Sequence, residues 1–169
     1  MAYQHIEGVK VRARFSEENG LRFRYRLDIT LENNSQAGKT VCVVMQNPSY
    51  ASESVADKSV QFMEKVIFLK GLQEFAGVRH MIVVNQFARI QTNNFQGSDL
   101  EIGSRNNAAI RSALKAADII VLGWGSGNRF TNRQVFVLRE IEKLNQKTVY
   151  KTKSHPSRAG YDGFILPYP

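Results

Sequence analysis

Four short, nearly continuous apolar segments alternate with three longer segments whose apolar residues recur at helical spacing. Continuous apolar runs are typical of strands buried on both faces of a parallel sheet, whereas apolar residues at i, i+3 and i+4 indicate amphipathic helices. That alternation predicts an α/β fold in which helices cover a mostly parallel sheet. The predicted strands lie within 39–48, 80–87, 118–125 and 147–152, and the predicted helices within 57–75, 104–118 and 131–145.

A β-hairpin is predicted before the first of these strands. The segments "VKVRARF" and "LRFRYRLDITL" flank Asn19-Gly20, a dipeptide that favours tight hairpin turns. Arg22, Arg24 and Arg26 alternate with apolar residues in the second segment, so a period of two places the three guanidinium groups on one face. That face is either an ordinary solvated surface or a stripe that contacts phosphates.

The chain is expected to form a single domain over residues 1–169, because no repeat, low-complexity tract or linker divides it. The expected architecture is a three-layer α/β/α sandwich with a central parallel sheet, in which 39–169 form the core and 1–32 add the antiparallel hairpin. Thr131 and Ser104 are the residues expected to open two of the helices.

Composition narrows the class of protein further. Apolar residues make up 43% of the chain and charged residues 22%, which is typical of a soluble globular protein. No apolar run approaches the roughly 20 residues of a membrane helix, and the N-terminal residues lack the apolar core of a signal peptide. With one cysteine and three histidines without ligand spacing, no disulfide, metal site or cofactor is expected. We expect a cytoplasmic monomer that does not bind membranes.

The charge balance points towards an anionic partner. Lys and Arg number 23 against 15 Asp and Glu, which gives a formal net charge of +8. Such an excess favours nucleic acid, here DNA, through the release of counterions. Many basic proteins bind no polyanion, so the charge alone does not decide the function.

Polar residues gather just after the end of each predicted parallel strand. The four loops read "QNPSYAS", "NQFARIQTNN", "GWGSGNRF" and "SHPSRAG". Each has a structural explanation by itself: Asn-Pro starts turns, Gly-Trp-Gly packs tightly and a lone His is often structural. Together they follow consecutive strands, whose carboxyl ends form the edge where open α/β sheets bind ligands. The order of the loops therefore predicts a ligand site.

That order resembles the uracil-DNA glycosylase superfamily. The first motif of that superfamily has the form Gly-Gln-Asp-Pro-Tyr or Gly-Ile-Asn-Pro-Gly, and here Gln46-Asn47-Pro48-Ser49-Tyr50 stands in its place. An apolar strand ends in Asn85, "VLGWGSG" is similar to a Leu-Leu-Trp-Gly-Ser strand, and His155-Pro156-Ser157 matches the closing His-Pro-Ser. The region of resemblance runs from about Val41 to Phe164.

A nearer resemblance is to a bacterial and phage family, domain of unknown function 1643. Members have an Arg-rich hairpin, a Leu-Asn-Pro-Ser-Thr-Ala loop, a Val-Val-Asn-x-Phe-Ala strand end and an Ala-x-Gly or Trp-Gly strand end. "MQNPSYAS", "VVNQFA" and "LGWGS" match these places. The family implies a fold but no activity.

The glycosylase resemblance implies a role for each matched residue. His155 would be a neutral donor to the carbonyl oxygen of the leaving base, Asn47 would position water, and the amide of Asn85 would read the edge of the base. Gln46 would contact the base as well, and an aromatic ring would stack on it, from Phe87, Tyr50 or Phe62. The residues expected to bind phosphates or DNA are Ser49, Ser126, Ser157, Arg158, Lys153 and Arg129.

Three departures from the superfamily pattern change the expectation. Asn47 replaces the Asp of the most active glycosylases, as in the slower branches. Ser49 stands where those enzymes have a Tyr that excludes thymine, which leaves room for a base with a 5-substituent. Ala159 is too short for the wedge that fills the vacated base stack, so either Arg158 serves as the wedge or no base is flipped.

Three functions remain open on the sequence. The first is a glycosylase that acts on a flipped, modified or unmodified pyrimidine in DNA. The second is a protein that binds or hydrolyses free nucleotides or nucleosides, and the third is a non-catalytic interaction domain. Burial of His155 against a carboxylate would favour the third, and basic residues around the cleft would favour the first. The basic residues expected there are Arg89, Arg105, Arg129, Lys153 and Arg158.

Overall fold

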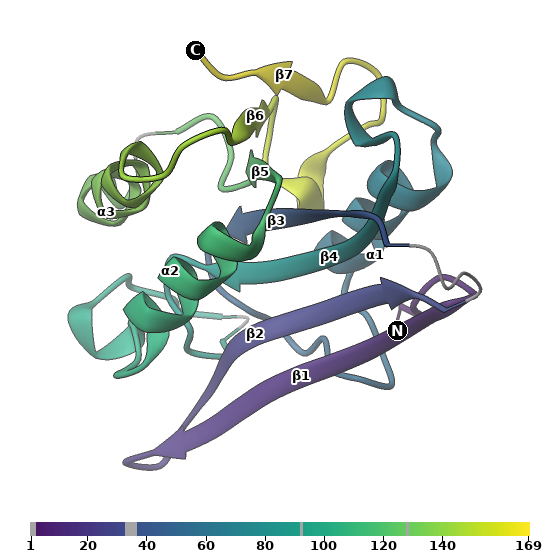
Figure 1. Cartoon of the computed structure of the whole chain (residues 1–169). Coiled ribbons are helices and arrows are strands. Elements are labelled where there is room, and N and C mark those ends of the chain that lie inside the picture. The colour runs from purple at the N-terminus through teal and green to yellow at the C-terminus, as the bar shows by residue number, and fades with distance from the viewer. Residues whose placement is uncertain (1–2, 33–36, 92, 128) are drawn as a thin grey trace.

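The computed structural model describes residues 3–32, 37–91, 93–127 and 129–169, and within them seven strands form one mixed sheet (Figure 1). The strand order is β1-β2-β4-β3-β5-β6-β7. The four strands β4, β3, β5 and β6 run parallel, while the hairpin at one edge and β7 at the other are antiparallel. The strands are β1 (Val9–Glu18), β2 (Leu21–Leu31), β3 (Lys39–Met45), β4 (Val78–Asn85), β5 (Ile119–Leu122), β6 (Thr148–Thr152) and β7 (Ile165–Pro167).

Helices cover both faces of this sheet. In Figure 1, α2 and α3 lie over one face and α1 lies over the other. Alternate residues of β3 divide between the two sides: Val43 packs in one apolar cluster with Val60 of α1, and Val44 packs in another with Leu114 of α2. The helices are α1 (Lys58–Glu64), continued by a π-helix (Lys65–Leu69), α2 (Asn106–Ala116) and α3 (Thr131–Glu142), with 3₁₀ turns at Gln73–Phe75, Asp99–Glu101 and Pro156–Arg158.

The prediction of an α/β fold with a parallel centre is confirmed, and the sheet is mixed because antiparallel strands flank that centre. Along the chain the parallel strands follow one another as β3, β4, β5 and β6, whereas their order in the sheet is β4-β3-β5-β6. From β3 the chain continues to β4, the neighbour of β3 on one side, and it later returns to β5, the neighbour of β3 on the other side. The crevice beyond the carboxyl end of β3 is therefore the switch point, where open α/β sheets bind ligands.

The hairpin turns at Asn19-Gly20, as predicted. Both residues have left-handed backbone angles, φ 52° and φ 76°, and positive φ at both central positions is the requirement of a type I′ turn. Gly and Asn adopt this region at little cost, which is why the dipeptide marks the turn.

The prediction that Arg22, Arg24 and Arg26 share one face is wrong, because a β-bulge interrupts β2. Arg14 of β1 lies opposite Arg26, but Phe15 lies opposite Arg24, so Tyr25 has no partner. One unpaired residue reverses the alternation of side chains along a strand.

The bulge sends two of the arginines to opposite sides of the sheet. Arg26 forms an ion pair with Asp28, and its charge acts on Cys42, which packs on the α2 side. Arg24 is 1% exposed and donates from Nη1 to the carbonyl oxygen of Ala51, 3.0 Å away. Arg24, which the alternating pattern placed in a surface stripe, is therefore buried at the end of the sheet.

Two helix starts differ from the prediction. Helix α2 begins after Arg105, and the Ser104 hydroxyl instead donates to Glu18 of β1 at 2.7 Å. Helix α3 includes Thr131 as its first residue and follows Phe130, whose φ is 61°. Within the described part of the chain, none of the helices has the length and apolar character needed to cross a bilayer.

Candidate functional site at the carboxyl edge of the sheet

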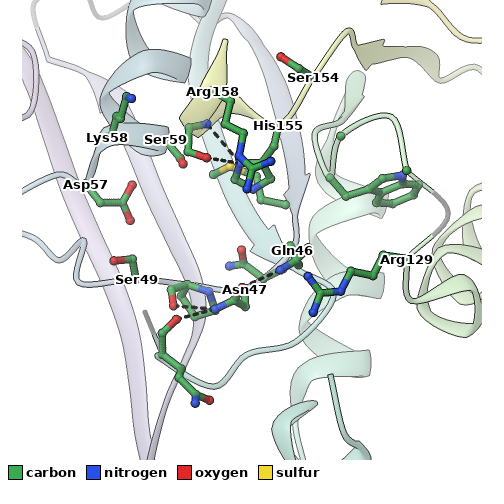
Figure 2. Close-up of a pocket in the computed structure, with 18 of the residues that line it drawn as sticks. Gln46, Asn47, Ser49, Asp57, Lys58, Ser59, Arg129, Ser154, His155 and Arg158 are labelled. Carbon is green, nitrogen blue, oxygen red and sulfur yellow. Dashed lines mark hydrogen bonds between the residues drawn. The ribbon is translucent and has the colours of Figure 1, made fainter. Parts of the chain in front are cut away.

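A cavity of about 660 Å³ lies at the carboxyl edge of the parallel strands. Residues that follow each of these strands line it, together with Arg24 of β2 and the start of α1. Figure 2 shows polar side chains from these separate segments around the same hollow. The sequence-predicted site residues that line it are Gln46, Asn47, Ser49, Tyr50, Asn85, Ser126, Arg129, His155, Ser157 and Arg158.

The last residue of β4, Asn85, lines this cavity with an unpaired amide. Its side chain is buried, with 2% of the residue exposed, and neither Oδ1 nor Nδ2 has a hydrogen-bond partner. The backbone around it is held firmly: the Asn106 amide donates to the carbonyl oxygens of Asn85 and Gln86 at 2.9 and 3.1 Å. Leaving a buried donor and acceptor unpaired costs about 1–3 kcal/mol each. A ligand that offers one acceptor and one donor would remove that cost.

The Asn47 side chain is engaged by the protein. Its Nδ2 donates to the carbonyl oxygen of Gln91 at 2.7 Å, and its Oδ1 accepts from Nε2 of Gln46 at 3.2 Å (Figure 2). These bonds fix the loop after β3 against the segment after β4. An amide oxygen has two lone pairs, so Oδ1 retains the capacity to orient one further donor, such as a water.

His155 stands in the loop after β6 with a defined tautomer. The backbone N–H of Ser157 donates to Nδ1 at 3.2 Å, and the Ser157 hydroxyl lies 2.8 Å from the same atom. Because Nδ1 accepts, the proton of the neutral ring resides on Nε2. Burial, and then the positive charge of Arg158, lower the pKa of His155 below its usual value, although Asp57 opposes them. At neutral pH the ring is therefore an uncharged hydrogen-bond donor.

Gly125 allows the loop after β5 to pass directly against the His155 loop. Its φ is 97°, and a Cβ placed there would lie 3.3 Å from the backbone nitrogen of His155. We expect Gly125→Ala to destabilise the protein by about 1–3 kcal/mol, because alanine is strained in this conformation. Urea denaturation measures the change.

The matched control for that substitution is Gly160→Ala in the same region. Gly160 has no positive φ, and a Cβ there would meet nothing within 4 Å. Gly160→Ala should therefore leave the free energy of unfolding nearly unchanged. Equal stability of the two variants would contradict the role given to Gly125.

Asp57 contributes a carboxylate to the cavity that was not predicted from the sequence. It precedes α1, is 7% exposed, and accepts from the backbone N–H of Val60 through Oδ1 at 2.8 Å. Figure 2 shows the same carboxylate facing the hollow. Its charge acts on both Arg24 and His155, since it raises the pKa of each. Asp57 is thus both a helix cap and a charged group within the site.

Among the described residues that line the cavity, cationic groups outnumber acidic ones. Arg24, Lys58, Arg129 and Arg158 line it, and Asp57 is the acidic residue. Of the other arginines and lysines expected at the cleft, Arg89 forms an ion pair with Glu101 at 3.7 Å, while Arg105 and Lys153 lie outside the lining. The excess positive charge suits a ligand with anionic groups.

The aromatic residues expected to stack on a base are divided between the cavity and the core. Tyr50 lines the cavity, and so does Trp124, the one tryptophan of the chain. Phe87 lies elsewhere, packed edge-on against the rings of Phe95 and Phe130. Phe62 is also outside the lining, stacked on Tyr161 and edge-on to Phe164.

Arg24 was considered only as part of a possible phosphate-contacting stripe on the hairpin and not as a residue of the cleft, because the hairpin appeared separate from the parallel core. Its backbone N–H donates to the carbonyl oxygen of Ala88, beyond the end of β4, and this bond holds the first residues of β2 next to the site. The bulge that aims Arg24 inward has no sequence signature of its own. Asp57 did carry a signal, because Asp followed by an amphipathic helix is a typical N-cap pattern.

Comparison with known proteins identifies the family. A model of a protein family of unknown function, DUF1643, matches residues 24–159, which include Arg24, the loops after the four parallel strands and His155. No curated protein and no solved structure gives a significant match. Since the matched region covers most of the chain, this protein belongs to the DUF1643 family.

Proposed function

We propose that the protein binds a pyrimidine nucleotide of DNA in this cavity, with the base turned out of the stack, and hydrolyses its N-glycosidic bond. The observation that carries the proposal is the buried, unpaired amide of Asn85 in a cavity that also contains the neutral ring of His155. An amide offers a donor and an acceptor in one plane, which matches the edge of a pyrimidine. The resemblance of the loop motifs to those of uracil-DNA glycosylases supports the same proposal. So does the presence of helices on both faces of the sheet, as the three-layer architecture implied by that resemblance requires.

The reaction assigns separate tasks to the residues of the cavity. Water attacks C1′ of the sugar, the bond between C1′ and the base nitrogen breaks, and the base leaves with the electron pair. His155 donates from Nε2 to the carbonyl oxygen of the departing base, where negative charge develops. Asp57 takes the proton of the attacking water, and Asn47 orients that water through Oδ1. The base acquires its proton afterwards from solvent.

Charge and aromatic groups would hold the nucleotide. Arg129, Arg158 and Lys58 are exposed side chains of the cavity lining, suited to contact phosphates of the strand. Tyr50 and Trp124 offer rings against which a base can stack. Ser49, which replaces the bulkier residue expected from the resemblance, leaves space for a base with a 5-substituent.

A free nucleotide is the second candidate ligand, and the size of the cavity favours it. A volume of about 660 Å³ falls in the range of pockets that enclose small molecules. The third function, a non-catalytic interaction domain, has less support, since His155 bonds to Ser157 rather than to a carboxylate.

Base release from oligonucleotides tests the proposal. We expect the wild-type protein to produce alkali-cleavable abasic sites in at least one oligonucleotide of a panel that carries uracil, mismatched thymine or 5-modified pyrimidines. Asn85→Ala should abolish the product while the fold remains intact, because the base edge then lacks its partner. The measurement is strand cleavage after alkali treatment.

No product from the whole panel, at protein in excess over DNA, would contradict the glycosylase proposal. Product from Asn85→Ala at the wild-type rate would mean that the activity does not come from this cavity. The same panel as free nucleosides and nucleotides, followed by chromatography for the free base, decides between DNA and the second candidate.

A further inference from the structure

Arg24 is a buried cation that forms no ion pair with a described carboxylate, although the charge of Asp57 acts on it. No Asp or Glu of the described residues forms an ion pair with it, and its Nε is buried without a hydrogen bond. Burial lowers the pKa of Arg24 to about 10, and the charge of Asp57 only partly opposes this. Even so, the guanidinium stays protonated at neutral pH. Proteins rarely keep a charge of this kind in the interior unless a partner compensates for it.

The position of Arg24 shows where such a partner would lie. The residue is 1% exposed, yet it lines the cavity, whereas Arg129 and Arg158 are exposed residues of the same lining. The bond from its Nη1 to the Ala51 carbonyl oxygen and the backbone bond to Ala88 fix both ends of the residue. A planar group with several N–H donors is therefore held in place at the wall of an open cavity.

We propose that Arg24, with Ser49 and Ser59 of the same lining, forms an interior anion subsite that binds a phosphate group of the nucleotide. A guanidinium matches the oxygens of a phosphate in geometry and charge, and serine hydroxyls add neutral donors. Because it lies in the wall of the cavity, this subsite recognises a phosphate that enters together with the base. The exposed arginines contact the strand outside.

The inference takes from the proposed function only that the ligand is a nucleotide, and its test measures binding rather than base release. Trp124 lines the cavity as the one tryptophan of the chain, so its fluorescence reports occupancy. The ligands are deoxyuridine, its 5′-monophosphate, its 3′-monophosphate and a five-residue single-stranded oligonucleotide. A phosphate-bearing ligand should bind at least about tenfold more tightly than the nucleoside, the effect of one hydrogen bond to a charged group.

In 0.5 M salt, the logarithm of the ratio of affinities for phosphorylated ligand and nucleoside should keep about half of its low-salt value or more. Buried charges are screened by salt much less than exposed ones. Arg24→Gln should remove this difference in affinity, and Arg24→Lys should retain part of it. The matched control is Arg26→Gln, two residues away on the opposite side of the sheet, where the guanidinium is paired with Asp28. Arg26→Gln should leave the ratio of affinities unchanged.

If a monophosphate binds more tightly than the nucleoside and the difference depends on Arg24, the subsite binds a terminal phosphate. If only the oligonucleotide shows this Arg24-dependent gain in affinity, the subsite binds a phosphate that links two nucleotides. Equal affinity of the wild-type protein for nucleoside and all phosphorylated ligands would overturn the proposal, even if the Arg24 variants do not fold. So would an equal loss for all ligands in Arg24→Gln, which is the result expected of a purely structural residue. Neither result depends on whether the protein releases bases.

Discussion

His155→Ala should slow base release by about 10²-fold or more, the effect of losing one group that stabilises charge in the transition state. The neutral ring donates from Nε2, because Nδ1 already accepts from the backbone of Ser157. His155→Gln should recover part of the rate, since an amide still donates a hydrogen bond. Single-turnover kinetics on the best oligonucleotide measure the three rates.

The pH dependence separates this role from a structural one. Burial, and then the charge of Arg158, hold the pKa of His155 below its usual value, so the neutral ring predominates at neutral pH and above. A neutral donor predicts a base-release rate without a His155-dependent change over that range. Below it, the rate should fall, because a protonated Nδ1 can no longer accept from the Ser157 N–H that orients the ring, and this acidic decline should weaken in His155→Gln.

Ser157→Ala serves as the control for the local loop. It removes the hydroxyl near Nδ1 but keeps the backbone N–H that sets the tautomer, so most of the rate should remain. A large drop in melting temperature for His155→Ala, with no change in base release, would assign His155 a structural role only.

Asp57→Asn should reduce base release by about 10²–10⁴-fold, the range for the loss of a general acid or base. The carboxylate is replaced by an amide of nearly the same shape, which cannot take up the proton of water. Asparagine is as good an N-cap as aspartate, so Oδ1 can still accept from the N–H of Val60. The melting temperature should therefore fall less than in a variant that also loses the cap, although the charge that partly compensates Arg24 is removed, while the rate falls strongly.

Asp57→Ala provides the contrast, because it removes the cap and the carboxylate together. We expect it to lose about 0.5–2 kcal/mol of stability in addition to the rate. If Asp57→Asn releases bases at the wild-type rate, Asp57 is a helix cap and the attacking water is activated by another group.

The central sheet was predictable because its signal is local. Val41–Met45 form a continuous apolar run since β3 is covered by clusters on both faces, and the polar residues after each parallel strand identified the edge that carries the cavity. The structure brings Asn85, the last residue of β4, and His155, which follows β6, into the lining of that cavity.

The features that sequence reasoning missed depend on distant contacts. The bulge at Tyr25 arises from the register of β1 against β2, and β7 is three residues long and pairs with β6 at the edge of the sheet. Phe87 was one of three aromatic residues that the glycosylase resemblance implied could stack on the base. Its ring instead completes an aromatic cluster with Phe95 and Phe130, whose positions are set by other loops.

The most direct test of a nucleobase site at the carboxyl edge of β3, β4, β5 and β6 is a crystal structure of the protein with a bound pyrimidine nucleotide. We predict that the base lies in the cavity, with its edge within hydrogen-bond distance of both Oδ1 and Nδ2 of Asn85 and with a carbonyl oxygen near Nε2 of His155. A nucleotide bound elsewhere, or bound in the cavity with the Asn85 amide still unpaired, would contradict the assignment of this site.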